Sequence, residues 1–211
     1  MRKTLIDFSA SLGLPLSDSA AQTLAGYAEL VWEKKDFLNL TSVRGKEEIF
    51  TRHLCDGLAA AALCAEQMQR KENFTAADLG AGAGYIGLTI ATALPRVHVT
   101  LVECLEKRCS FLNWAVLKLG LKNVRIQCLR LGQKDGGSFD FVTERAMGKI
   151  NDILPLAISC LQPGGMFAPY QSDPAEADAA LLKRLGLRTE PARPYILPGE
   201  SKTRYLAVFR K

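Results

Sequence analysis

The sequence is poor in the residues from which metal centres and histidine-based catalytic sites are built. It has 2 histidines among 211 residues, and its 6 cysteines include no C-x-x-C pair. Because zinc sites need closely spaced cysteine and histidine ligands, we expect no metal site. The cysteines are scattered through apolar segments, which is typical of buried free thiols in a cytoplasmic protein.

Long apolar runs are also missing. No stretch approaches the ~20 consecutive apolar residues that a membrane-spanning helix needs. The opening residues Met1-Arg2-Lys3 resemble the start of a signal peptide, but Asp7, Ser9 and Ser11 interrupt any hydrophobic region behind them. We therefore expect an ordinary N-terminus, a cytoplasmic location and no membrane partner. Internal repeats and low-complexity segments are absent from the sequence as well.

What the chain does have is an unevenly placed positive charge. Its 27 lysines and arginines outnumber its 22 acidic residues, which gives a net charge of +5. Residues 1–75 contain 9 basic and 10 acidic residues, whereas residues 183–211 contain 8 basic and 2 acidic ones. A basic C-terminal region indicates an anionic partner such as nucleic acid, and ordinary solvated surface charge is the alternative.

The spacing of apolar residues changes along the chain. Residues 1–72 show helical spacing, including a helix from about residue 46 to 69, and we assign them to an N-terminal helical extension packed on the core. In residues 73–211, short β-type segments alternate with helical ones. The strands are expected near residues 75–78, 97–103, 124–129, 139–143, 166–170 and 205–209, with an extended piece near 195–197. This alternation predicts an α/β fold with a doubly wound, mostly parallel, Rossmann-like sheet.

The most informative stretch is residues 76–87, Ala-Ala-Asp-Leu-Gly-Ala-Gly-Ala-Gly-Tyr-Ile-Gly. It is typical of a buried strand, a glycine turn and a helix start. Glycines allow tight turns and let a ligand lie against the main chain, and the free N–H groups of the following helix point to the same place. Counted from Asp78 the stretch matches D-x-G-x-G-x-G of S-adenosylmethionine (AdoMet) sites. Counted from Gly82 it matches G-x-G-x-x-G, the dinucleotide fingerprint.

Three observations favour AdoMet. Asp78 precedes the turn where a pyrophosphate would need a positive pocket, whereas the sulfonium and ammonium groups of AdoMet suit a carboxylate. The chain after Glu103 is too short for a second domain that would hold a hydride-transfer substrate. A late strand after Pro163-Gly164-Gly165 and a helix matches the plan of AdoMet enzymes. Glu103, 21 residues after Gly82, could accept the ribose hydroxyls of either ligand, so an NAD(P)-binding oxidoreductase stays an alternative.

Short motifs spread over nearly the whole chain occur together in one known family. They are Asn39-Leu40-Thr41-Ser42-Val43-Arg44, Arg52-His53-Leu54-Cys55-Asp56, Asp78 to Gly87, Leu105-Glu106-Lys107-Arg108, Phe139-Asp140 through Arg145-Ala146, and Pro163-Gly164-Gly165. In these motifs the chain resembles the bacterial small-subunit ribosomal RNA guanine-N7 methyltransferases, also called glucose-inhibited division protein B.

The resemblance implies a class I AdoMet-dependent methyltransferase sheet and an activity on N7 of an unpaired guanine in small-subunit (16S) ribosomal RNA. It implies AdoMet as the cofactor, the ribosomal RNA or the 30S subunit as the partner, and a monomer. Guanine N7 is an unprotonated lone pair at neutral pH, so no general base is needed and the enzyme acts by positioning. The target guanine should be unpaired, because the deep major groove of an RNA duplex is closed to side chains.

The resemblance also implies a set of cofactor-binding positions. Tyr85 would pack over the cofactor, Leu131 and Gly132 would flank its adenine, and Arg145 would position substrate or cofactor. An ion pair of Arg145 with Glu144 or Asp140 is the alternative. The full set is Asp78, Gly80, Gly82, Tyr85, Glu103, Leu131, Gly132 and Arg145.

Basic residues in and near the motifs are candidates for contacts with RNA, and together they would make binding sensitive to salt. For His53 the alternative is a hydrogen-bonded structural role. The candidates are Arg44, Arg52, His53, Lys107, Arg108 and Arg204.

The chain departs from the family pattern at three positions. Gly132 stands where an acidic residue is usual, so adenine would be held by backbone or by Gln133. Glu144 stands where serine is usual, and Gln171 where lysine is usual. These departures keep open a second alternative, a non-catalytic module that binds AdoMet or RNA without transferring a methyl group.

Overall fold

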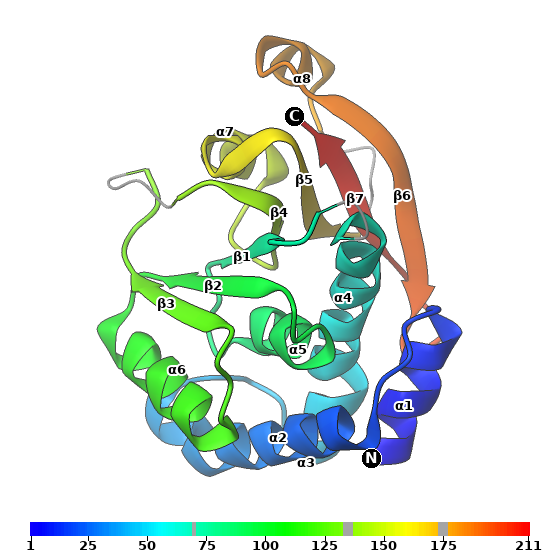
Figure 1. Cartoon of the computed structure of the whole chain (residues 1–211), viewed down its shortest axis with the longest axis vertical. Helices are drawn as coiled ribbons and strands as arrows, with labels where there is room; N and C mark the ends of the chain where they lie inside the picture. Colours follow the sequence, from blue (N-terminus) through cyan, green and yellow to red (C-terminus); the bar gives the residue numbers. More distant parts are fainter. Residues whose placement is uncertain (69–70, 133–136, 173–176) are drawn as a thin grey trace.

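The fold is built around one twisted sheet. The computed structural model describes residues 1–68, 71–132, 137–172 and 177–211, and it places 7 strands in the order β3-β2-β1-β4-β5-β7-β6 (Figure 1). The strands are β1 (Thr75–Leu79), β2 (His98–Glu103), β3 (Val124–Cys128), β4 (Phe139–Glu144), β5 (Leu161–Gln171), β6 (Arg188–Ile196) and β7 (Thr203–Arg210).

Strand direction confirms the predicted doubly wound α/β fold. The pairs β1–β2, β2–β3, β1–β4 and β4–β5 are parallel, and β7 pairs antiparallel with both β5 and β6. The strand order reverses between β1 and β4. In such sheets the carboxyl ends of the strands at the reversal open a crevice that binds ligands.

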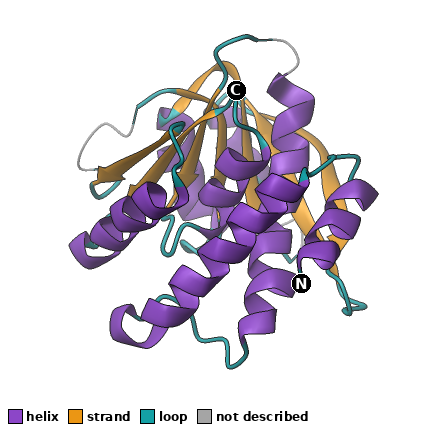
Figure 2. Cartoon of the chain, turned by 60° about the horizontal axis from the view of Figure 1, so that its bottom comes forward, coloured by secondary structure: helices purple, strands orange, loops and turns teal. Residues whose placement is uncertain are grey.

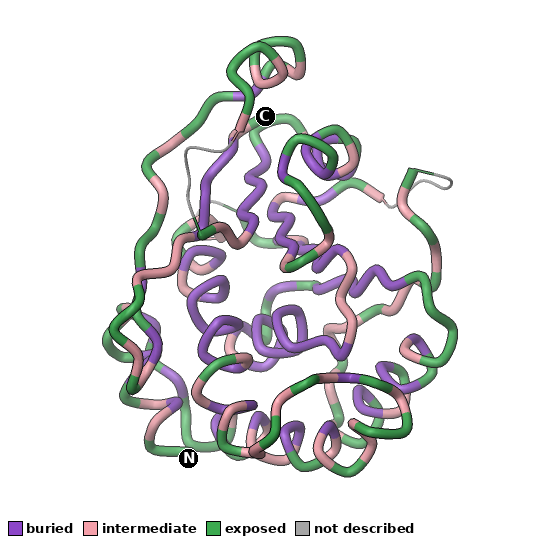
Figure 3. Tube along the Cα trace, turned by 180° about the vertical axis from the view of Figure 1, so that it is seen from behind, coloured by how far each residue is buried: buried purple, intermediate pink, exposed green. Residues whose placement is uncertain are grey.

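Helices cover both faces of the sheet, as Figure 2 shows from a second direction. Apolar residues of α1, α2, α4, α5 and α6 belong to one core cluster. Those of α7 and α8 pack in a second cluster, on the other face of the sheet. Figure 3 shows α5 buried along its length at the centre of the molecule. The helices are α1 (Arg2–Ser11), α2 (Asp18–Leu38), α3 (Lys46–Glu48), the π-helical η1 (Ile49–Leu54), α4 (Cys55–Met68), α5 (Tyr85–Ala93), α6 (Glu106–Leu119), α7 (Ile150–Ser159) and α8 (Ala179–Arg184).

The N-terminal helices share their core with the sheet domain. Leu5, Leu24 and Tyr27 belong to the same cluster as residues of β1 and α5. The fully buried Tyr27 also donates from its hydroxyl to the carbonyl of Ala83 at 2.6 Å, which ties α2 to the glycine turn. The division of the chain into 1–72 and 73–211 stays a prediction.

Two elements differ from the sequence-based prediction. The helix expected over 46–69 is interrupted by η1, a π-helical turn of a kind that is rare and frequent at functional sites. Of the extended piece expected near 195–197, Tyr195 and Ile196 end β6, a nine-residue strand at the edge of the sheet, and Leu197 lies beyond it. In the sequence, Pro191 and Pro194 argue against a strand over these residues, because proline has no N–H to donate to a neighbouring strand. An edge strand tolerates them, because one row of its N–H groups has no partner strand.

Candidate functional site

The turn between β1 and α5 forms the floor of the candidate site. Gly80, Gly82 and Gly84 have φ angles of 64°, 59° and 90°, in the left-handed region that favours glycine. A Cβ on Gly80 would lie 2.6 Å from Cγ of Met147, so a side chain there would also clash. The N–H of Ala81 donates to the carbonyl of Val102 at 3.0 Å, which fixes the turn against the end of β2. The turn has the backbone geometry that the glycine spacing predicts.

Asp78 lies buried directly beneath this turn. Its side chain is 2% exposed, and its Oδ2 accepts a hydrogen bond from the N–H of Gly87 at 2.8 Å. Burial raises the pKa of Asp78 to about 7. The carboxyl group therefore changes its ionisation near neutral pH, and a neighbouring cation would favour the charged form.

Glu103 is fixed on the other side of the turn, at the last position of β2. Its Oε2 accepts from the N–H of Gly82, and its Oε1 accepts from the N–H groups of Cys104 and Leu105, all at 2.9 Å. The residue is 4% exposed. Since each carboxylate oxygen has two lone pairs, Oε2 keeps capacity to accept a further hydrogen bond from a ligand.

His53, Tyr85 and Arg145 form a side wall of the site. The ring centroids of His53 and Tyr85 lie 4.3 Å apart in a stacked arrangement, and Cζ of Arg145 lies 5.8 Å from the Tyr85 centroid. Nη2 of Arg145 and Nδ1 of His53 are 3.2 Å apart. Because a guanidinium can only donate, Nδ1 accepts, and the ring proton of His53 is on Nε2.

The neutral form of His53 follows from these contacts. Its Nε2–H donates to Oγ1 of Thr41 at 3.1 Å. Burial and the charge of Arg145 lower the pKa of His53 to about 3. His53 is therefore hydrogen-bonded on both ring nitrogens and lines the candidate site, and its contact with RNA stays a prediction.

Arg145 is held by a carboxylate that lies 89 residues earlier in the chain. Its Nη1 donates to Oδ2 of Asp56 at 2.6 Å. The predicted alternative, an ion pair with Glu144 or Asp140, is wrong. Asp140 pairs instead with Lys71 at 2.8 Å, and Glu144 accepts from the backbone N–H of Met147 at 3.1 Å.

Asp56 is the centre of a buried network. It is 1% exposed, and its Oδ1 accepts from the hydroxyl of Tyr195 at 2.7 Å. Nη1 of Arg204 lies 3.6 Å from its Oδ2, and its carbonyl accepts from the hydroxyl of Tyr170 at 2.6 Å. The network joins α4 to β5, β6 and β7, so the C-terminal strands help to position Arg145.

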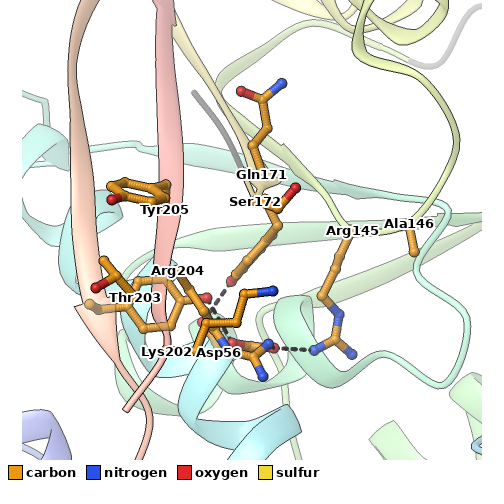
Figure 4. A pocket seen from close by; sticks show the side chains of 11 residues that line it. Asp56, Arg145, Ala146, Gln171, Ser172, Lys202, Thr203, Arg204 and Tyr205 are labelled. Carbon is orange, nitrogen blue, oxygen red and sulfur yellow. Dashed lines mark hydrogen bonds and ion pairs between the residues drawn. The ribbon is translucent and has the colours of Figure 1, made fainter. Parts of the chain in front are cut away.

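Two cavities meet at Arg145. The first, about 310 Å³, is lined by Leu40, Thr41, Ser42, His53, Asp78, Gly80, Ala81, Gly82, Ala83, Tyr85, Ile86, Arg108, Arg145 and Ala146. It brings together five of the predicted cofactor-binding residues: Asp78, Gly80, Gly82, Tyr85 and Arg145. The second, about 340 Å³, shares only Arg145 and Ala146 with it and is drawn in Figure 4.

Leu131 and Gly132 lie after β3, at the same edge of the sheet. Leu131 packs against the second core cluster, and Gly132 has a φ of 82°. Neither lines the first cavity. Their predicted contact with adenine stays a prediction, and Gln133 lies outside the described residues.

Three basic candidates lie in the loop before α3 and in the first turn of α6. Arg44 and Lys107 are exposed, and neither has an ion pair within the described ranges. Arg108 lines the first cavity, donates to the carbonyl of Asn39 at 3.4 Å, and has its Nη1 3.8 Å from Oε2 of Glu103. Arg108 therefore belongs to the cavity wall as much as to the surface.

The other two basic candidates are tied to acidic partners. Arg52 donates to Glu200 at 2.9 Å and to Glu48 at 3.2 Å. Arg204 donates to Glu200 at 3.0 Å. These ion pairs offset part of the positive charge that the sequence places here. A role in RNA binding for Arg44, Arg52, Lys107, Arg108 and Arg204 stays a prediction.

Sequence reasoning assigned no role to Asp56, Thr41 or Tyr195. A signal for Asp56 was present, because it is the one charged residue in the apolar stretch from Leu54 to Cys64. A charge in a buried helix needs a partner, and that requirement marks the position. No comparable signal marks Tyr195, whose partner is 139 residues away.

Comparison with known proteins gives a family match over most of the chain. Residues 20–190 match the family model described as GidB, rRNA small subunit methyltransferase G. The ribosomal RNA small subunit methyltransferase G of Limosilactobacillus reuteri (strain DSM 20016) is 31% identical over 212 residues, covering 96% of this chain and 87% of the relative. The protein of that name from Aromatoleum aromaticum is 32% identical, with coverages of 99% and 98%.

Solved structures show the same fold at lower identity. TrmN from Thermus thermophilus superposes with a TM-score of 0.57 at 24% identity, covering 74% of this chain and 48% of that one. At this identity the likeness concerns the fold alone.

Proposed function

The chain belongs to the rRNA small subunit methyltransferase G family, and from this premise we propose that it methylates N7 of an unpaired guanine in small-subunit ribosomal RNA, using AdoMet. The observation that carries the proposal is the pair of buried carboxylates, Asp78 and Glu103, on the two sides of the glycine turn.

The residues of the first cavity fit AdoMet together with Glu103, which does not line that cavity but accepts a hydrogen bond from its residue Gly82. Glu103 is fixed by backbone donors at the end of β2 and would accept the ribose hydroxyls. Asp78 would sit near the positively charged end of AdoMet, which favours its ionised form. A dinucleotide would instead bring a pyrophosphate to a turn that has the buried carboxylate of Asp78 beneath it, which disfavours the oxidoreductase alternative.

When bound, AdoMet would supply a methyl group on a sulfonium, and its transfer to the N7 lone pair would leave the electron pair of the broken C–S bond on sulfur. N7 loses no proton, so the site needs no base, and His53 is held in a form that does not titrate near neutrality. Arg145 is oriented by Asp56 and His53, and its remaining N–H groups can face a ligand in either cavity. The contribution of this chain is thus the placement of reacting groups.

The RNA partner is either free ribosomal RNA or the 30S subunit, and the active form is a monomer in the cytoplasm. Exposed Arg44 and Lys107 support contact with phosphates. Over the described residues, no helix combines the length and apolar character needed to span a bilayer.

The experiment that tests the proposal measures binding and transfer separately. Calorimetry with AdoMet and with NAD should detect binding of AdoMet alone. Transfer of labelled methyl groups should then occur to the small-subunit RNA and not to large-subunit RNA. Asp7→Ala, which removes an exposed residue that lines neither cavity, serves as the unaffected control variant. Binding of AdoMet without transfer to naked RNA or to 30S subunits would support the non-catalytic module instead.

A further inference from the structure

Two cysteines from separate elements meet beside Glu103. Cys109 lies near the start of α6, and its Sγ donates to the carbonyl of Glu103 at 3.3 Å. Cys128 is the last residue of β3, and the parallel register of β2 and β3 places it directly opposite Glu103. Both cysteines are free thiols. The two thiols therefore lie against the backbone of the same residue.

The side chain of Cys128 projects from the face of β3 that α6 covers. Successive side chains of a strand alternate between its two faces. Val124 and Ile126 pack in the core cluster that contains Phe111 of α6, so Cys128, two residues further on, projects to that face as well. Figure 1 shows α6 running alongside β3. Burial, and next the interaction with the Cys128 thiol, raise the pKa of Cys109 to about 12. The two thiols are therefore direct neighbours.

The two thiols differ in their access to solvent. Cys128 is exposed at the end of the edge strand β3, contrary to the expectation from the sequence that the cysteines are buried. Cys109 is 4% exposed. Because the thiolate is the reactive form and a raised pKa keeps Cys109 protonated, an oxidant reacts first with Cys128. An accessible thiol in contact with a second one is the arrangement of redox-sensing cysteines.

We propose that Cys109 and Cys128 form a redox modification site, at which a small-molecule disulfide such as oxidised glutathione joins them in a disulfide bond. The Cys128 thiolate attacks one sulfur of the reagent, forms a mixed disulfide and releases one small thiol. The Cys109 sulfur then attacks the Cys128 sulfur and gives up its proton, and the second small thiol leaves. The protein loses two electrons and two protons, and the reagent is reduced to two thiols.

The second step is favoured although the Cys109 thiolate is scarce. The attack is intramolecular between neighbouring sulfurs, and a thiolate of high pKa is a strong nucleophile. The reaction is reversible, because small thiols in excess reduce the bond again. Where disulfides occur in cytosolic proteins, they are usually transient and redox-sensing.

The disulfide would act on the cofactor site through Glu103. Disulfide sulfurs are about 2 Å apart, so two thiols in non-bonded contact must approach each other, and α6 must shift relative to β3. The loop before α6 supplies the N–H groups of Cys104 and Leu105 that hold the Glu103 carboxylate. Cys109 also loses the proton that it donates to the Glu103 carbonyl. The oxidised chain should therefore bind AdoMet more weakly, a consequence that rests on the proposed function.

Peptide mapping tests the site without relying on AdoMet. The full chain is incubated with oxidised glutathione, digested under non-reducing conditions and analysed by mass spectrometry. Peptides joined through Cys109 and Cys128 should appear in wild type and in Cys104→Ser, which removes a second exposed thiol near Glu103, and dithiothreitol should separate them. An unmodified chain, glutathione on Cys128 without the bond to Cys109, or a different cysteine pair would overturn the proposal.

Calorimetry with AdoMet tests the consequence for the cofactor. It compares Cys104→Ser with the double variant Cys104→Ser/Cys128→Ser, before and after treatment with oxidised glutathione. The Kd of Cys104→Ser should rise by about tenfold or more, the loss expected when a charged hydrogen bond is disturbed, and dithiothreitol should restore it. The double variant should keep its Kd, because Cys109 cannot form the bond. An unchanged Kd in a chain that carries the mapped disulfide would overturn the link to the cofactor.

The two readouts separate this inference from the proposed function. A reduced chain that does not bind AdoMet contradicts the proposed function, whereas the mapped peptides still decide whether the disulfide forms. Because Cys128 is exposed, its replacement by serine removes no core packing, and the two reduced variants should have the same Tm.

Discussion

Asp56→Asn is the substitution that most strongly perturbs the centre of the site. Asp56 accepts from Arg145 at 2.6 Å and from Tyr195 at 2.7 Å, with Arg204 at 3.6 Å, and it is 1% exposed. Asparagine has almost the same size, so the change removes charge and leaves the packing volume intact. Arg145 would then lose its counter-ion, and Arg204 would keep only Glu200, at 3.0 Å.

The magnitude follows from the burial of the pair. Removing one partner of a buried ion pair typically costs about 3–5 kcal/mol. The side chain of Arg145 is 24% exposed and that of Arg204 is 30% exposed, so water can solvate them in part. We therefore expect a loss near the lower limit, about 3 kcal/mol of unfolding free energy. For a chain of this length that corresponds to about 6–12 °C in Tm.

Urea unfolding and thermal melting of the purified variant measure this loss. Asp7→Asn is the matched control, because Asp7 forms an exposed ion pair with Lys3 at 2.9 Å and should cost less than about 0.5 kcal/mol. The rate of methyl transfer should fall by more than the loss of folded protein explains, because Arg145 loses its orientation. If the Asp56→Asn variant had the same Tm as the Asp7→Asn control, the argument that Asp56 holds Arg145 would be refuted.

Four further predictions concern the glycine turn and the residues around it. Because burial raises the pKa of Asp78 to about 7, the carboxylate is protonated below pH 7, and the affinity for the cationic AdoMet should fall there by up to about tenfold per pH unit. In calorimetry, the AdoMet affinity of Asp78→Asn should not change with pH. Glu103→Ala should weaken AdoMet binding by about 1–3 kcal/mol, and unchanged affinity would refute its role. The pKa of His53 is lowered to about 3, so the contribution of neutral His53 to the free energy of unfolding is present above pH 6.5 and is lost as pH falls toward 3. Urea titrations between pH 6 and 4 should therefore show that His53→Gln gains stability relative to wild type as the pH falls. Gly84→Ala should cost about 2 kcal/mol by urea unfolding, because φ is 90° and the new Cβ would lie 2.6 Å from Leu112; a neutral result would contradict the strain.

Local features of the site could be predicted from the sequence. The glycine turn follows from residues whose φ angles only glycine adopts easily, and the place of Glu103 follows from the length of one βα unit. The parallel sheet follows from the alternation of strand and helix patterns. Each of these depends on neighbours in the chain, which is the range over which propensity and periodicity act.

Contacts between distant segments could not be predicted. Arg145 pairs with Asp56 across 89 residues and not with the nearby Glu144 or Asp140, because the fold brings α4 beneath β4 and points Glu144 elsewhere. The partner of Arg52 is Glu200, 148 residues away. Hydrophobic periodicity carries no information about such pairings, since they depend on how strands and helices are stacked in space.

The measurement that tests the central claim most directly is nucleoside analysis of methylated RNA. Small-subunit RNA and 30S subunits are incubated with the protein and labelled AdoMet, and the RNA is then digested completely to nucleosides. The account predicts that the label is found in 7-methylguanosine, and that Glu103→Ala at limiting AdoMet sharply reduces it. Label in any other nucleoside, or none in either RNA substrate, would contradict it.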